Sequence, residues 1–199
     1  PPRSTLFPYT TLFRSAGSGE VRVVPLLRTD LNEREPLVQE LPIQEAYYWV
    51  DGEQLTIALR SRRASALGRA FGFNWEMSLV LDELPAGSAR LYPLKGDAVR
   101  IVQTAGADQR RSRTWTGIAV VDAPEDGRLS GRFHINVRQQ QFTLLGGWQP
   151  PFLRAPTMVV VGRFEAVANT KLAMGIRQWT EAQGFERTSS PASRPAPPG

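Results

Sequence analysis

The chain has 199 residues, a formal net charge of +5 and a hydrophobic fraction of 41%, which is enough apolar material for one ordinary domain. It contains no cysteine, and this excludes a disulfide scaffold, zinc held by thiolates, iron–sulfur ligation and cysteine catalysis. No run of about eighteen consecutive apolar residues occurs, so no transmembrane segment is visible in the sequence.

The first fifteen residues, PPRSTLFPYTTLFRS, begin with proline rather than methionine. Back-translated in a single frame, they resemble a common short-read sequencing-library adapter that ends at Ser15. We therefore expect residues 1–15 to be an artefact and the native chain to begin at Ala16. On this hypothesis the true N-terminus is missing, together with any export signal that it carries.

Composition divides the rest of the chain into three parts. Residues 16–42 open with Ala-Gly-Ser-Gly, which is typical of a flexible linker, and their prolines then predict extended or irregular chain with room for one edge strand. Residues 43–187 are predicted to form a single β domain that ends in a helix. Residues 188–199 are rich in Pro, Ser and Ala, and this composition predicts a disordered tail. The segment has too little apolar surface to bury, so burial would not compensate the conformational entropy lost on folding.

Within the predicted domain, apolar and polar residues alternate with a period of two. Residues 45–50 and 54–60 flank Asp51-Gly52, a dipeptide that predicts a hairpin with a type I′ turn. The segment 122–127, which contains a second Asp-Gly, is predicted to form another hairpin turn. The further strands are expected at 75–81, 89–92, 98–104, 113–121, 128–137, 139–145 and 157–168. About nine strands at this spacing indicate an all-β fold, an antiparallel β-sandwich or small barrel.

One C-terminal helix is predicted after the last strand. Asn169 is suited to the N-cap position, and Gly184 to the position that follows the helix. Leu172, Ile176 and Trp179 share one face by helical spacing, and we expect this face to cover the sheet.

Motifs for catalysis and for nucleotide binding are missing. The sequence holds no G-x-S-x-G, S-x-x-K, H-E-x-x-H or Walker A pattern, and His134 is its one histidine. The acidic residues of the 122–127 turn lack the ligand spacing of a calcium loop. We expect neither a metal nor a cofactor.

Three segments carry candidate ligand-binding residues. Two loops, ALGRAFGF and GGWQPPF, hold aromatic rings that could stack on a sugar or a partner, with an arginine in the first; they could also fold back to close the ends of the β structure. In the strand at 128–137, polar residues alternate with core residues and project to the opposite face. The candidates are Arg69, Phe71, Trp148, Phe152, Arg132, His134 and Arg138.

These features favour a non-catalytic binding or structural module of a bacterial envelope or secreted protein. A periplasmic, outer-envelope or secreted location is expected, with a saccharide or a protein as the partner and not a nucleic acid. The first alternative is a hydrolase with two carboxylates converging in a cleft. The second is a lipocalin-like barrel that binds an apolar ligand in a deep cavity.

Overall fold

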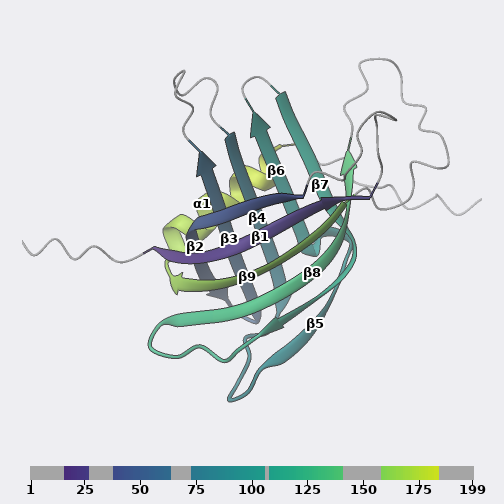
Figure 1. The fold of residues 1–199 in the computed structure, drawn as a ribbon. Helices are drawn as coiled ribbons and strands as arrows, with labels where there is room; N and C mark the ends of the chain where they lie inside the picture. Colours follow the sequence, from purple (N-terminus) through teal and green to yellow (C-terminus); the bar gives the residue numbers. More distant parts are fainter. Residues whose placement is uncertain (1–15, 27–37, 64–72, 106–107, 141–157, 184–199) are drawn as a thin grey trace, which may run out of the picture.

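The computed structural model describes residues 16–26, 38–63, 73–105, 108–140 and 158–183. Figure 1 shows the strands and the single helix of this part of the chain. In chain order they are β1 (Gly17–Pro25), β2 (Gln39–Asp51), β3 (Gln54–Arg63), β4 (Phe73–Asp82), β5 (Arg90–Lys95), the 3₁₀ turn η2 (Gly96–Ala98), β6 (Val99–Ala105), β7 (Asp108–Val121), β8 (Arg128–Gln140), β9 (Met158–Ala168) and α1 (Thr170–Ala182). Residues 1–15, Gly184 and the predicted tail at 188–199 lie outside the described residues.

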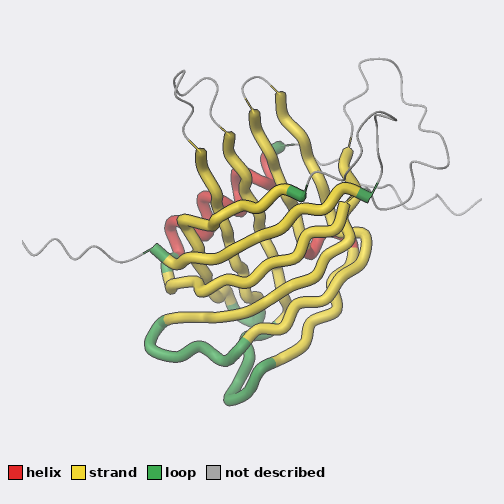
Figure 2. The backbone as a smooth tube through the Cα atoms, viewed as in Figure 1, coloured by secondary structure: helices red, strands yellow, loops and turns green. Residues whose placement is uncertain are grey.

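Eight strands form a closed antiparallel barrel (Figures 1 and 2). The hydrogen-bonded order β7-β6-β4-β3-β2-β1-β9-β8 returns to β7, which pairs with β8. Strand β5 adds a ninth strand at the edge, because the first half of β7 pairs with β6 and the second half with β5. The prediction of an antiparallel all-β domain with one C-terminal helix is confirmed.

The segment from residue 17 to residue 25 is a strand of the barrel. The linker predicted at its start was wrong, and the strand that the prediction allowed for is an interior strand rather than an edge strand. Strand β1 lies between β2 and β9 and pairs with both of them. Where β1 begins, β2 and β9 converge and pair directly, at Tyr47–Val167 and Tyr48–Ala168. A Cβ at Gly17 would overlap backbone oxygens of both neighbouring strands, so only glycine fits at this point. The glycines indicate close backbone approach here rather than flexibility.

The two Asp-Gly dipeptides form different turns. Asp51 pairs with Gln54, so the loop consists of Gly52 and Glu53, and Gly52 has a positive φ of 56°. This is the φ pattern of a type II′ turn rather than the predicted type I′ turn. The type I′ pattern occurs at Asp126-Gly127, where both φ values are positive and Glu125 and Arg128 exchange both backbone hydrogen bonds.

The barrel interior is filled by apolar side chains from every strand of the ring. The alternation predicted for β3 and β4 is confirmed, because the inward residues of both strands are buried. They are Leu55, Ile57, Leu59, Trp75, Met77, Leu79 and Leu81. The outward residues Thr56, Ala58 and Ser78 are also buried, because α1 covers this side of the barrel.

Helix α1 packs on the outside of β2, β3, β4 and β6 (Figure 2). Asn169 caps it as predicted, by accepting a hydrogen bond from the backbone N of Leu172 at 3.1 Å. The predicted contact face was wrong in part, because Leu172 and Trp179 are exposed and the buried residues are Ala173, Ile176 and Thr180. The small residues allow the helix to approach the strands closely, and Thr180 Oγ1 lies 2.8 Å from Ser78 Oγ.

Candidate anion-binding groove

The outer face of β8 carries the polar residues predicted for it. Phe133, Ile135 and Val137 are buried in the barrel. Arg132 and His134 alternate with them and are exposed, on the side of the barrel that α1 leaves uncovered. The pairing of β8 with β7 and β9 extends this polar row across neighbouring strands.

An open groove of about 590 Å³ crosses β7, β8, β9 and β1 on this face. Gly19 and Gly131 contribute backbone without side chains to its lining, and Phe164, which is buried in the core, also borders it. Val120 and Ala89 supply apolar wall, and the remaining lining is polar or charged. The groove is open to the surface, and its polar side chains supply donors and acceptors that can orient a ligand.

Two arginines face each other in this groove. Arg132 of β8 lies directly opposite Arg163 of β9. Opposed like charges on neighbouring strands are destabilising unless counter-charges are present. Arg163 has one, because Glu20 accepts a hydrogen bond from it at 2.9 Å. The side chain of Arg132 forms neither a hydrogen bond nor an ion pair with any residue that the structure describes.

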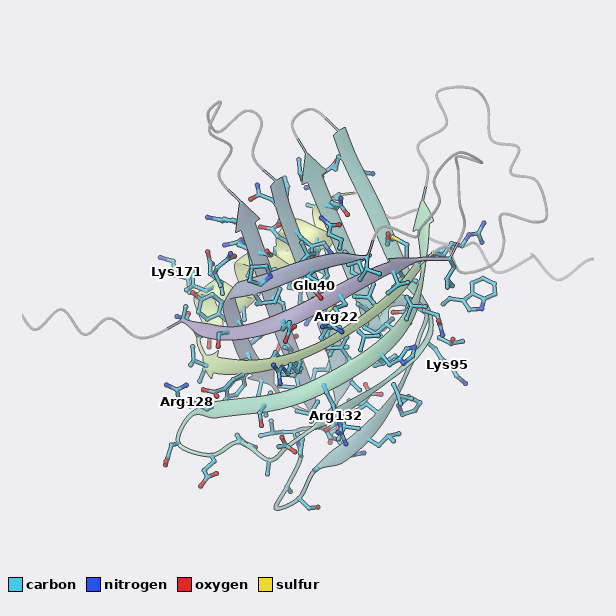
Figure 3. All side chains as sticks on the ribbon, viewed as in Figure 1. Arg22, Glu40, Lys95, Arg128, Arg132 and Lys171 are labelled. Atoms are coloured by element: carbon cyan, nitrogen blue, oxygen red, sulfur yellow. The ribbon has the colours of Figure 1, made fainter. Side chains whose placement is uncertain are left out.

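The neighbouring part of the groove carries two carboxylates. Asp122 accepts a hydrogen bond from Ser130 Oγ at 2.6 Å. Glu165 lies opposite Ser130 and forms an ion pair with Arg128. The groove is thus polarised. Two guanidinium groups and the carboxylate of Glu20 lie in one row across the strands, and the carboxylates of Asp122 and Glu165 lie in the next row. Figure 3 shows Arg132 and Arg128 along β8.

Of the three candidate residues that the structure describes, one lies in the groove. Arg132 lines it, and His134 lies in the next row, opposite Ile118 and Val161. Arg138 lies farther along β8, opposite Arg113, and does not line the groove. The other four, Arg69, Phe71, Trp148 and Phe152, lie outside the described residues.

Sequence reasoning missed Arg163, Asp122 and Glu165. The alternation of β9 already assigns Arg163 and Glu165 to one polar face. Their position beside Arg132 depends on the register of β8 against β9, which a single sequence does not supply.

A second charged cluster lies on the outer face of β2, β3 and β4, on the side of the barrel that carries α1. The guanidinium of Arg60 donates from Nε to Glu76 at 2.6 Å and from a terminal nitrogen to Glu45 at 3.0 Å. Both acids flank the same cation, and Arg60 and Glu76 are largely buried. The guanidinium of Arg60 is therefore occupied by two carboxylates of its own chain.

Within the described ranges, no group of three or more His, Cys, Asp or Glu residues is placed to hold a metal ion. An enclosed space inside the barrel, bordered by Trp75, Ile101 and Met158, has a volume of about 30 Å³, which is room for about one water molecule.

No helix in the described part of the chain has the length and apolarity needed to cross a membrane.

Comparison of this chain with protein-family models, with curated proteins and with solved structures finds no match.

Proposed function

We propose that this domain is a non-catalytic binding module that holds the carboxylate or phosphate group of a ligand in the groove on β8 and β9. The observation that carries the proposal is the opposed pair Arg132–Arg163, which has one acid partner for two guanidinium groups. An anion between them would relieve their repulsion and accept charge-assisted hydrogen bonds from both.

The neighbouring acids narrow the ligand class. Asp122 and Glu165 can accept hydrogen bonds, so a hydroxyl or amine donor close to the anionic group fits the polarised groove. A ligand that carries both functions is bound better than a simple anion. An acidic saccharide and an acidic segment of a partner protein both meet this description.

Of the two architectures predicted, we favour the small barrel, because the hydrogen-bonded order of its strands closes on itself. The location of the protein in a bacterial envelope or outside the cell stays a prediction. The part of the chain that the structure describes gives neither alternative function a specific argument. The groove carboxylates Asp122 and Glu165 each have a partner, and the space of about 30 Å³ in the barrel is too small for an apolar ligand.

The proposal is tested by titrating the ¹⁵N-labelled full chain with glycerol 3-phosphate and following backbone and arginine side-chain signals. We expect shifts confined to residues around Arg132 and Arg163, with a dissociation constant in the range of about 1 mM that is usual for a small, solvent-exposed anion. Arg132→Gln should weaken binding about tenfold, the equivalent of one lost charge-assisted bond.

The matched control is Arg62→Gln, which makes the same charge change at an exposed arginine of β3 on the other side of the barrel. It should bind as the unmodified chain does. Equal losses in the two variants would show that the effect is general electrostatic attraction and would contradict the proposal. An unmodified chain whose signals do not shift would contradict it as well.

A further inference from the structure

A row of exposed apolar side chains runs beside the groove. Pro93 of β5 lies opposite Ile118 of β7, and His134 of β8 separates Ile118 from Val161 of β9. Ile118 is 47% exposed and Val161 is 39% exposed. Because neighbouring strands are about 4.8 Å apart, this row is about 14 Å wide. Leu91, which is 59% exposed, lies two residues before Pro93 on the same strand. We call Leu91, Pro93, Ile118 and Val161 the apolar band.

The apolar band is continuous with the two arginines of the groove. Leu91 lies opposite Val120, Val120 lies opposite Arg132, and Arg132 lies opposite Arg163. Val120 belongs to the groove lining. A ligand whose anionic group lies between Arg132 and Arg163 would therefore extend directly onto aliphatic side chains.

Basic and aromatic residues border the band on its other side. Lys95 lies opposite Thr116, is exposed, and forms no ion pair with the residues that the structure describes. Trp115, which precedes Thr116 in β7, is the extra residue of a β-bulge and is 45% exposed. Figure 3 shows that Lys95 and Arg132 stand apart from each other on this side of the barrel. Positive charge thus flanks an apolar surface on two sides.

We infer that this face docks on an anionic lipid bilayer, with a headgroup phosphate between Arg132 and Arg163 and the apolar band in contact with the acyl region. The inference rests on the proposed anion site and names its ligand. Amphipathic helices that lie in the membrane interface combine leucine and tryptophan with basic residues, and this β face presents the same combination of side chains. Each cation near an anionic leaflet adds to the attraction.

The chemistry of the band favours lipid over the other anionic ligands. Hydroxyl-rich sugars do not cover aliphatic side chains such as Leu91, Ile118 and Val161, whereas acyl chains do. A headgroup that joins a phosphate to hydroxyl donors, as phosphatidylglycerol does, also fits the acceptors Asp122 and Glu165. Choline has no donor to offer them, and phosphatidylcholine carries no net charge.

The test is sedimentation of the full chain with two kinds of vesicle. One kind contains phosphatidylcholine alone, and in the other about 30% of the lipid is phosphatidylglycerol, so that about one lipid in three is charged. We expect binding to the anionic vesicles, decreasing as salt is added, and little binding to the neutral ones. The double variant Leu91→Ser/Ile118→Ser should lower the partition coefficient about tenfold or more, since two aliphatic side chains no longer enter the interface.

Two controls keep the outcomes apart. Leu172→Ser changes an exposed leucine of α1, on the opposite side of the barrel, and should leave vesicle binding unchanged. The double variant should still bind glycerol 3-phosphate, because Arg132 and Arg163 are intact. If glycerol 3-phosphate binds the groove and anionic vesicles do not, the lipid inference is wrong, the band is left for a protein partner, and the proposed function stands. An equal loss of vesicle binding in Leu172→Ser would also overturn the inference.

Discussion

Phe133 of β8 and Phe164 of β9 stack inside the barrel, with ring centroids 6.4 Å apart and planes inclined by 26°. Each ring lies over a glycine of the other strand, because Phe133 is opposite Gly162 and Phe164 is opposite Gly131. A Cβ at Gly162 would lie 2.5 Å from Cζ of Phe133, and a Cβ at Gly131 would lie 2.6 Å from Cζ of Phe164. The two rings thus fill the part of the core that side chains at Gly131 and Gly162 would otherwise occupy.

Gly162→Val should therefore destabilise the domain by about 1–3 kcal/mol, since its methyl groups would displace the ring of Phe133 from a closely packed core. The free energy of unfolding in urea measures the loss. Gly175→Ala is the control, because Gly175 lies on α1 with no atom within 4 Å of an added Cβ. That change should stabilise the domain by about 0.5–1 kcal/mol through helix propensity. An unfolding free energy for Gly162→Val equal to that of the unmodified chain would refute the packing argument.

Arg60→Met should lower the free energy of unfolding by about 3 kcal/mol. The change leaves Glu76, which is largely buried, without the cation that compensates its charge. Arg62→Met is the comparison, because the side chain of Arg62 is exposed and lies 3.9 Å from Glu45 at its closest. Its loss should cost no more than about 1 kcal/mol. Chemical denaturation of both variants at neutral pH decides the matter, and similar losses would mean that burial does not strengthen the Arg60 pairs.

Asn169→Ala should cost about 1 kcal/mol, because the backbone N–H of Leu172 would lose its acceptor at the start of α1. Asn169→Asp keeps an acceptor at the same position and should retain most of the stability. Thermal unfolding of the two variants, followed by circular dichroism, separates the effect of the cap from that of a changed side chain. A loss of similar size in Asn169→Asp would show that the cap is not the cause.

Local sequence patterns predicted most of the elements. The alternation in β3 and β4 gave the correct buried residues, because one side of each strand faces an apolar interior. The cap at Asn169 was predictable because it depends on residues three positions apart. Local sequence did not predict the turn type at the two Asp-Gly dipeptides. The register of the flanking strands decides which two residues are central in each loop, and the two registers differ.

Features that depend on long-range pairing were not predictable. Ala16–Gly19 resembles a linker in composition, and the convergence of β2 and β9 is what gives Gly17 its role. The face of α1 was assigned to the largest apolar residues, whereas close packing on Ala58 and Ser78 selected Ala173 and Thr180. The groove follows the same rule. Its Arg132 was a candidate, but its partner Arg163 comes from a strand whose register no local pattern contains.

Stability should fall at alkaline pH, and Tyr92 should account for part of the loss. Tyr92 is buried, and its hydroxyl donates to the backbone oxygen of Glu83 at 3.0 Å. Burial raises the pKa of Tyr92 above its ordinary value of 10.0, with Arg90 acting in the opposite direction and Glu83 adding to the rise. Burial also raises the pKa of Tyr47 and of Tyr48.

The direction of the effect follows from proton linkage. Below about pH 10 the tyrosines are protonated in both the folded and the unfolded chain, so their contribution to stability is fully present. As the pH rises above about 10, the unfolded chain releases these protons first, and the free energy of unfolding decreases until the folded state titrates at its higher pKa. Tyr92→Phe keeps the ring and removes one of the three groups. Urea unfolding at about pH 8 and about pH 11 should give a smaller difference for this variant than for the unmodified chain, although the lost hydrogen bond lowers its stability at both values by about 1 kcal/mol. An equal difference in the two proteins would show that Tyr92 does not contribute to the alkaline loss.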